Sequence, residues 1–383
     1  MPLPGYEVNL IESPPSPSVF TDISTGFACG KATNEEFGLV YSIDQFVRLF
    51  GDREAQSPLY DGVQVFFREG GFRCYVATCD MDGTNDDVIA AAAQFTNDLG
   101  PGTLFAPGIT DPAFQLEFVG NTQTMNRIAL LDAPDTNDIE ALVQASAAIT
   151  GKSSANGDRF SAMFAPWDIA PGLLTGTTRT TPPSARVAGN LARNDSLGYS
   201  SGDPAAAALG IARYVQGLSQ PAWNDDDRTE LNESSINVSR QMLNSVRTYG
   251  WRSLADQTTD TDWSMFNAAR IVLAVKASLD VVAENFVFSK LDSMARVTAK
   301  FGGAISAVLL DFYNNGDLYG DTPQDAYIVD TGPAVNTDQS FAQGYLQASV
   351  GIRTASMGER VVINVAKIPI TESLGATSTT TTS

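Results

Sequence analysis

Residues 127–148, RIALLDAPDTNDIEALVQASAA, decide the fold class of this 383-residue chain. The first six form an apolar run typical of a buried strand, which an Asp-Ala-Pro turn ends. Residues 137–148 are typical of a helix, and a second buried strand is expected at 160–164, before Pro166-Trp167. Strand, helix and strand in this order favour a largely parallel sheet covered by helices.

The same alternation of helices and strands continues towards both ends of the chain. A helix is expected between the N-cap residue Ser42 and Gly51, and another is expected to begin near Asp262. Further helices are predicted at residues 59–69, 86–99 and 289–313, and further strands at 72–79, 102–105, 326–329 and 347–352.

Strand-like segments lie near both ends of the chain. Each alternates apolar and polar residues, and the first is followed by a proline-rich stretch. Because a lone strand is not stable, the N-terminal segment must pair with another part of a protein, and residues 360–367 are predicted to form the last strand. The alternating apolar residues are Tyr6, Val8 and Leu10 in the first segment and Val361, Ile363 and Val365 in the second. Residues 373–383, almost all Ser and Thr, are predicted to be disordered.

The charge composition argues against two classes of partner. The chain has 24 basic and 44 acidic residues, a net charge of −20. Nucleic-acid binders usually present a basic face, and anionic membrane surfaces attract basic segments, so we expect neither partner. The N-terminal residues do not resemble a signal peptide, and no apolar run reaches the ~18 residues of a membrane span.

The chain contains no histidine. A Ser-His-Asp triad, a Cys-His dyad and histidine-containing zinc sites are therefore excluded. The three cysteines, Cys29, Cys74 and Cys79, are too few for a disulfide framework, and we expect them to be buried and reduced. Cys74 and Cys79 lie five residues apart in one predicted strand, so they should point to opposite faces.

Several other motifs suggest sites, but a structural role fits each of them better. Gly151-Lys152-Ser153 has Ser146 where a phosphate loop needs glycine, so we interpret it as a helix end and loop. The run 225–227, three aspartates, lacks the spacing of a calcium loop and favours a solvated turn before a helix. Core or interface packing is expected of the tryptophans Trp167, Trp223, Trp251 and Trp263.

The order of motifs resembles that of contractile bacteriophage tail sheath proteins (the Myoviridae-type sheath family). Its opening is similar to Tyr41-Ser-Ile-Asp-Gln-Phe46, Phe50-Gly51 and Gly70-Gly71, and its middle to Met163-Phe-Ala-Pro-Trp167 and Pro182-Pro-Ser-Ala-Arg-Val-Ala-Gly189. Gly250-Trp251 inverts the family's Trp-Gly. The motif residues to which we assign packing roles are Pro166, Trp167, Pro182, Pro183, Gly189, Arg193, Asp195, Asn232, Asn237, Trp251 and Arg252. The resemblance covers about residues 20–368 in collinear order.

The resemblance implies an α/β fold, with a subtilisin-like parallel-sheet core lacking catalytic residues and an α+β C-terminal domain. It implies an extended N-terminal arm at residues 1–18, an outer α/β region at 19–250, an inner domain facing the tube at 251–355 and a C-terminal arm at 356–372. In such proteins the two arms donate strands to neighbouring subunits.

The resemblance also implies a structural function without catalysis, cofactor or metal. Such a subunit would polymerise as stacked hexameric rings around an inner tail tube, contact baseplate and tail terminator proteins, and contract during genome delivery. It would be part of a virion assembled in the bacterial cytoplasm. The alternatives are the sheath of a contractile injection or secretion system and, in another class, an α/β hydrolase or binding module.

The proline-led segment 182–195 admits two interpretations. It could be a catalytic loop, but we favour a structural turn that packs the domains together. Arg186 and Arg193 within it are expected to form ion pairs inside or between subunits, since carboxylates outnumber basic residues and a buried guanidinium needs a partner.

Overall fold

The computed structural model describes residues 22–120, 122, 125–220, 223–242, 244–291, 296–359, 361 and 363. The predicted arm residues Tyr6, Val8, Leu10 and Val365 and the tail 373–383 lie outside the described residues. No described helix is long and apolar enough to cross a membrane.

An eight-stranded sheet forms the centre of the larger part of the molecule, in the order β11-β10-β6-β5-β4-β1-β3-β2. The six inner strands are parallel, and β2 and β11 add an antiparallel strand at each edge. The strands are β1 (Gly26–Lys31), β2 (Phe37–Val40), β3 (Cys74–Cys79), β4 (Gly102–Phe105), β5 (Arg127–Asp132), β6 (Ser161–Ala165), β10 (Ile236–Met242) and β11 (Ser245–Thr248). The predicted α/β class with a largely parallel sheet is confirmed.

Helices cover both faces of this sheet, so that side chains alternating along each strand enter two separate cores. In β5, Ile128 and Leu130 join one core, whereas Ala129 and Leu131 join the other. The first core contains α1 (Ile43–Phe50), α2 (Leu59–Glu69) and α6 (Pro183–Ser196). The second contains α3 (Asn85–Ala92), α4 (Pro112–Gly120), α5 (Ile139–Ala147) and α7 (Asp225–Glu233).

The elements with strong local sequence signals were predicted correctly. The Ser42 side chain accepts from the Gln45 N–H at the start of α1, and Gly51 ends this helix with φ of 95°. The bounds of α2, β4 and β5 match the predicted ranges. The three cysteines are buried and free, and Cys74 lies in a different core from Cys79, as expected.

The helix predicted at residues 86–99 is shorter in the structure, and α3 ends at Ala92. Phe95 turns into the core and contacts the ring of Phe27. The guanidinium of Arg127 donates hydrogen bonds to the carbonyl oxygens of Phe95, Thr96 and Gly100. These carbonyls therefore bond to a buried arginine instead of continuing the helix.

The segment 182–195 was wrongly predicted as a turn or loop, because it forms the buried helix α6. Pro183 stands in the first turn, where a missing N–H costs no hydrogen bond and the fixed φ suits a helix. Gly189 allows close packing against α2, since a Cβ there would lie 2.4 Å from the carbonyl oxygen of Phe66.

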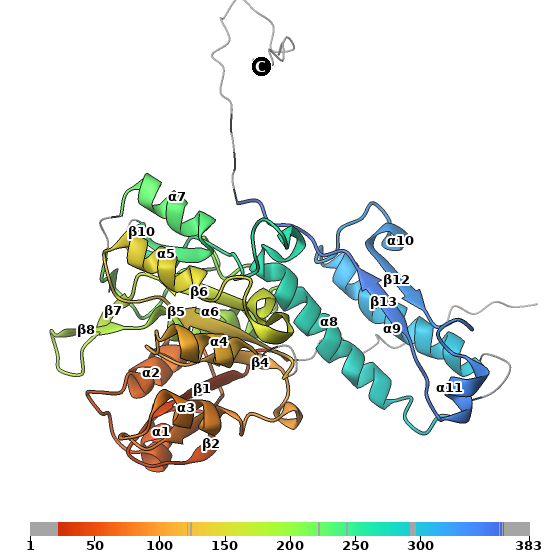
Figure 1. The fold of residues 1–383 in the computed structure, drawn as a ribbon, viewed down its shortest axis with the longest axis horizontal. Coiled ribbons are helices and arrows are strands. Elements are labelled where there is room, and N and C mark those ends of the chain that lie inside the picture. Colours follow the sequence, from red (N-terminus) through yellow and green to blue (C-terminus); the bar gives the residue numbers. More distant parts are fainter. Residues whose placement is uncertain are drawn as a thin grey trace, which may run out of the picture.

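A small antiparallel sheet lies beyond the end of β6 and contains β7 (Asp168–Pro171), β8 (Thr178–Thr181) and β9 (Gly217–Leu218). Strands β7 and β8 form a hairpin that projects from the body at the left of Figure 1. This sheet was not predicted.

The C-terminal part is built on two long helices, α8 (Phe266–Glu284) and α9 (Arg296–Asn314). Figure 1 shows α8 running from the large sheet towards α9 and the strands β12 (Tyr327–Asp330) and β13 (Ser349–Ile352). Two short helices, α10 (Pro323–Ala326) and α11 (Asp338–Ala342), complete this part. Residues 289–291 are not helical, so the start predicted for the second helix was wrong.

Candidate functional site

A buried ion pair fixes α6 to the small sheet. The Arg186 Nε lies 2.7 Å from Asp168 Oδ2, and both side chains are fully buried. The two terminal nitrogens of Arg186 donate to Thr248 Oγ1 and Ser239 Oγ. Burial raises the pKa of Asp168 to about 6, and Arg186 acts in the opposite direction. One guanidinium therefore joins α6, β7, β10 and β11 inside the core.

A second buried ion pair joins α6 to α2. Arg193 Nη1 lies 3.3 Å from Glu69 Oε2 and 2.6 Å from the Glu69 carbonyl oxygen. The Glu69 carboxylate also accepts from the backbone N–H groups of Arg213, Tyr214 and Val215. Burial, and to a smaller extent Arg213, lowers the pKa of Arg193. Both arginines expected to form ion pairs do so within the chain.

A third pair connects α6 to the C-terminal part. Arg270 of α8 places Nη2 2.6 Å from Asp195 Oδ1, at the end of α6. Burial raises the pKa of Asp195, and the charge of Arg270 opposes this effect. A largely buried charge pair thus joins α8 to the end of α6, which packs on the large sheet.

The end of β5 is tied to the start of α6. Asp132 accepts from the Ser184 hydroxyl, the Ser184 N–H and the Gly108 N–H. Burial is the main reason that the pKa of Asp132 is raised, to about 6. Ser184 and Asp132 are both buried. A serine beside a carboxylate could suggest catalysis, but this serine is shielded from solvent and the chain has no imidazole.

Asn237 and Arg252 connect strand β10 to the C-terminal segment that contains Glu359. The Asn237 side chain accepts from the Arg252 N–H at 2.6 Å and donates to the Arg252 carbonyl at 2.8 Å. The Arg252 guanidinium binds both oxygens of Glu359, at 3.0 and 2.7 Å. Just beyond, Val361 and Ile363 are 80% and 78% exposed. Glu359 lies 107 residues from its partner in the sequence and was not predicted as a site residue.

The remaining motif residues occupy structural positions. Trp167 follows Pro166, and its Nε1 donates to the Ala133 carbonyl. The buried Trp251 contacts Phe164 and Phe266. Pro182 precedes α6 as its N-cap residue. Asn232 lies half-buried in α7, and its carbonyl accepts from the Ser235 N–H.

The other candidate sites also have structural explanations. The three aspartates 225–227 form the first turn of α7, where Asp227 completes a capping box with Asn224. Gly151 lies in a turn with φ of 66°. Trp223 donates to the Asn137 side chain, and Trp263 contacts Phe160. In the described part of the chain, no three acidic or cysteine side chains are grouped so that they could hold a metal ion.

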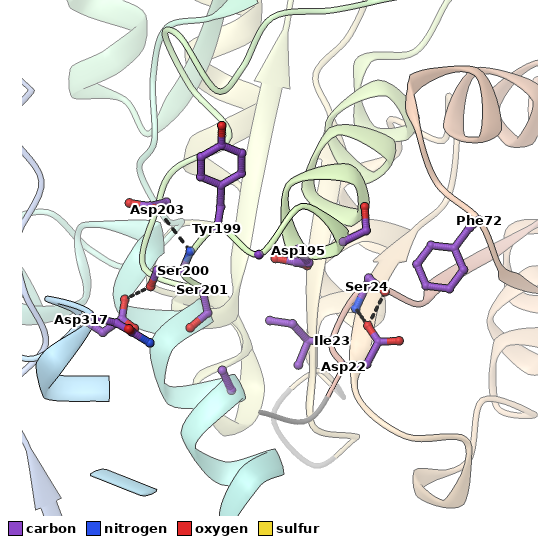
Figure 2. A pocket seen from close by; sticks show the side chains of 14 residues that line it. Asp22, Ile23, Ser24, Phe72, Asp195, Tyr199, Ser200, Ser201, Asp203 and Asp317 are labelled. Atoms are coloured by element: carbon purple, nitrogen blue, oxygen red, sulfur yellow. Dashed lines mark hydrogen bonds between the residues drawn. The ribbon is translucent and has the colours of Figure 1, made fainter. Parts of the chain in front are cut away.

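A cavity of about 560 Å³ opens where the large sheet, α8 and the end of α9 meet. Figure 2 shows that Asp22, Asp195, Asp203 and Asp317 line it. Asp317 is buried and accepts from the Ser200 hydroxyl and the Gly202 N–H, and burial raises its pKa. The described chain begins at this cavity, with Asp22 (Figure 2).

The two-stranded sheet β12–β13 has open edges. Its strands pair antiparallel, from Tyr327 opposite Ile352 to Asp330 opposite Ser349. Among the described residues neither strand pairs with a third strand. Ile328 of β12 is 68% exposed. Such edges present N–H and C=O groups to which a further strand can add.

Comparison with known proteins gives matches in structure only. No protein-family model matches the chain, and no curated protein sequence matches it. A chain of the contracted sheath complex of PVC, an extracellular contractile injection system, is 19% identical with a TM-score of 0.71, over 96% of this chain and 98% of that one. A chain of the contracted baseplate of the anti-feeding prophage is 18% identical with a TM-score of 0.72, over 96% of this chain and 98% of that one.

A bacterial tail protein is also similar. The sheath tail protein from Desulfitobacterium hafniense is 8% identical with a TM-score of 0.55, over 85% of this chain and 93% of that one. The chain therefore has the fold of contractile sheath proteins, and the predicted resemblance is confirmed at the level of the fold. Its TM-scores are higher against the PVC chain and the anti-feeding prophage chain than against the Desulfitobacterium protein.

Proposed function

We propose that the chain is the structural subunit of a contractile sheath, which polymerises as stacked hexameric rings around an inner tube and shortens to drive the tube forward. The observation that carries this proposal is the match to a contracted sheath complex over 96% of this chain and 98% of that one. The match extends over almost the whole of both chains, so it includes the large sheet and the C-terminal part alike.

Strand exchange between neighbours would hold the rings together. The donated strands are the segments with Tyr6, Val8 and Leu10 and with Val361, Ile363 and Val365, and the receiving sheet is β12–β13. The open edges of this sheet and the exposed Val361 and Ile363 support the assignment. Each backbone hydrogen bond contributes ~1 kcal/mol net, so one added strand contributes a few kcal/mol. Repeated at every subunit, such links would form a continuous mesh.

Contraction would then be a change in how rigid bodies pack against one another. The ion pairs Arg186–Asp168, Arg193–Glu69 and Arg270–Asp195 support a body that moves as one unit. In this proposal residues 19–250 face outwards and 251–355 face the tube, while arms 1–18 and 356–372 stay paired in both states. The likeness of the core to subtilisin stays a prediction.

The proposed partners are other copies of the chain, a tube protein, and baseplate and terminator proteins at the ends. The particle would be a phage virion, assembled in the bacterial cytoplasm, or an injection device. The injection device is favoured by two of the similar chains, which come from a contractile injection system and from the anti-feeding prophage.

Deletion of residues 1–12 tests the role of the N-terminal arm. The variant should remain a folded monomer and lose polymerisation, because the deletion removes Tyr6, Val8 and Leu10 from the donated strand. Deletion of residues 373–383, a segment of similar length outside the strand, is the matched control and should leave polymerisation intact. Tubes formed equally well by both variants would refute strand donation by this arm.

A further inference from the structure

The hydrogen bonds of the β12–β13 sheet show which of its backbone groups are open. The Arg353 N–H donates to the Ala326 carbonyl, one position beyond the last pair of the ladder. In an antiparallel pair, residues that bond across the ladder alternate with residues whose N–H and C=O point outwards. By this alternation the outward groups are those of Val329 on β12 and those of Val350 and Ile352 on β13. The sheet therefore offers two separate edges to a further strand.

The edge on β13 continues past the end of that strand. The Tyr319 N–H donates to the Arg353 carbonyl, and Leu318 forms a bridge with Thr354. Because the N–H and C=O of Arg353 point to one side, residues 317–319 lie on the same side as β12. On the other side, no described strand pairs with β13.

The surroundings of the β12 edge are acidic. Residues 301–352 contain six aspartates and no basic residue. Two of these aspartates, Asp325 and Asp330, flank β12 and are exposed. Their carboxylates accept from the Thr322 hydroxyl and the Gly332 N–H, and neither forms an ion pair with a described basic side chain. A strand added at this edge therefore meets two uncompensated negative charges.

The β13 edge has a different charge. Arg353 directly follows β13, is exposed and forms no ion pair with a described carboxylate. It lines a groove of about 480 Å³ together with Asp262, which is also exposed. One positive and one negative group balance each other here. An acidic strand is therefore tolerated better at the β13 edge than at the β12 edge.

The two terminal segments differ in charge in the opposite sense. Residues 1–21 contain Glu7 and Glu12 and no basic residue. Residues 360–371 contain Arg360 and Lys367 and no acidic residue. Like charges brought together across an interface are costly, and opposite charges set which partners and registers are allowed. Charge thus distinguishes the two donors from each other, as it distinguishes the two edges.

The C-terminal segment begins far from β12 of its own chain. Glu359 binds Arg252, which is in turn held by Asn237 of β10 in the large sheet. Figure 1 shows the large sheet and the β12–β13 sheet on opposite sides of α8. The occupant to which this geometry points is therefore the terminal segment of another copy.

We propose that charge assigns each arm to one edge, so that residues 360–367 of one neighbour add to β12 and residues 6–11 of another add to β13. The inference rests on the proposed sheath function and adds to it the order of the strands: C-terminal arm, β12, β13, N-terminal arm. Arg360 and Lys367 lie against Asp325 and Asp330, and the acidic arm lies at the edge that carries Arg353. An exchange of the two arms would place Glu7 and Glu12 beside aspartates.

Charge reversal tests the β12 edge, with tube formation followed by light scattering. R360E/K367E and D325K/D330K should each raise the subunit concentration needed for tubes at least about fivefold at low salt, because attractive pairs become repulsive. The four changes combined should restore the wild-type value to within about twofold. Each loss should shrink at about 1 M salt, which screens the charges. Circular dichroism of the monomers checks that every variant is folded.

A matched control reverses two exposed carboxylates on other elements, Asp280 of α8 and Asp311 of α9. D280K/D311K should not restore tubes of the R360E/K367E variant. The β13 edge is tested by E7K/E12K, which should weaken tube formation, and R353E should then restore it. If the N-terminal arm lay on β12 instead, E7K/E12K would strengthen tube formation.

The outcomes separate this inference from the proposed function. Tubes of R360E/K367E or D325K/D330K that form as readily as wild type would overturn the assignment and leave the sheath function standing. Absence of rescue by the combined variant, or equal rescue by D280K/D311K, would do the same. Failure of the unmodified chain to form tubes, alone and on added tail tubes, would overturn both.

Discussion

Replacing Arg186 with methionine is expected to destabilise the subunit strongly. The side chain is fully buried and makes three polar contacts, to Asp168, Thr248 and Ser239, at 2.6–2.9 Å. Methionine fills much of the same space but leaves the Asp168 carboxylate without its cation. The other oxygen of Asp168, Oδ1, is buried and has no hydrogen-bond partner among the described residues, so the charge cannot be compensated locally.

The magnitude follows from the cost of a buried charge that loses its partner. Removing one side of a buried ion pair costs about 3–5 kcal/mol. This is a large share of the ~5–15 kcal/mol that stabilises a typical folded protein. The assay is urea unfolding of the monomeric subunit near neutral pH, with R186M compared to the wild type. Arg48 is exposed on α1, so R48M is the matched control and should change stability by less than about 0.5 kcal/mol.

The double variant R186M with D168L separates a lost charge from lost packing. Because apolar residues of similar volume can replace a buried ion pair at little cost, it should recover most of the stability that R186M loses. The reasoning would be wrong if R186M lost less than about 1 kcal/mol, or if the double variant were no more stable than R186M.

Three further predictions follow from the same structure. The pKa of Asp132 is about 6 in the folded state and 3.8 in the unfolded state. Protonated Asp132 therefore stabilises the fold at low pH, and the unfolding free energy should fall as pH rises from about 4 to about 6. D132N should flatten this part of the stability–pH curve measured by urea unfolding, and an unchanged slope would count against the prediction. R252E and E359R should each impair polymerisation, and their combination should restore it if the pair orients the C-terminal segment; light scattering measures this, and no rescue would reject the idea. G189A should destabilise the monomer by about 1–3 kcal/mol, because a Cβ there meets the backbone of α2, whereas G303A on α9, where nothing lies within 4 Å, should be neutral or stabilising in thermal unfolding.

The parts of the fold that were predicted correctly have strong local signals. The helix α2 and the strands β4 and β5 are apolar segments bounded by Gly, Pro or a cap, so their bounds follow from nearby residues. Helix α6 was missed because Pro182-Pro183 was interpreted as a loop, although proline also suits the first turn of a helix. The end of α3 depends on Arg127, more than 30 residues away, and local periodicity carries no such information.

The candidate site was predictable by residue type but not by partner. The excess of carboxylates indicated that Arg186 and Arg193 would be paired. Their partners, Asp168 and Glu69, are set by tertiary packing, the latter 124 residues distant. Glu359 was likewise missed, since nothing near it in sequence indicates a salt bridge with Arg252. Short strands such as those of the β7–β8 hairpin, with few apolar residues, gave no clear pattern.

Electron microscopy of the purified protein, with light scattering alongside, tests the sheath proposal most directly. The proposal predicts hollow tubes or stacked rings with six-fold symmetry, formed either alone or when tail tubes are added as a template. A monomer that stays monomeric and does not bind added tail tubes would contradict it, and an α/β binding module would then be the better description.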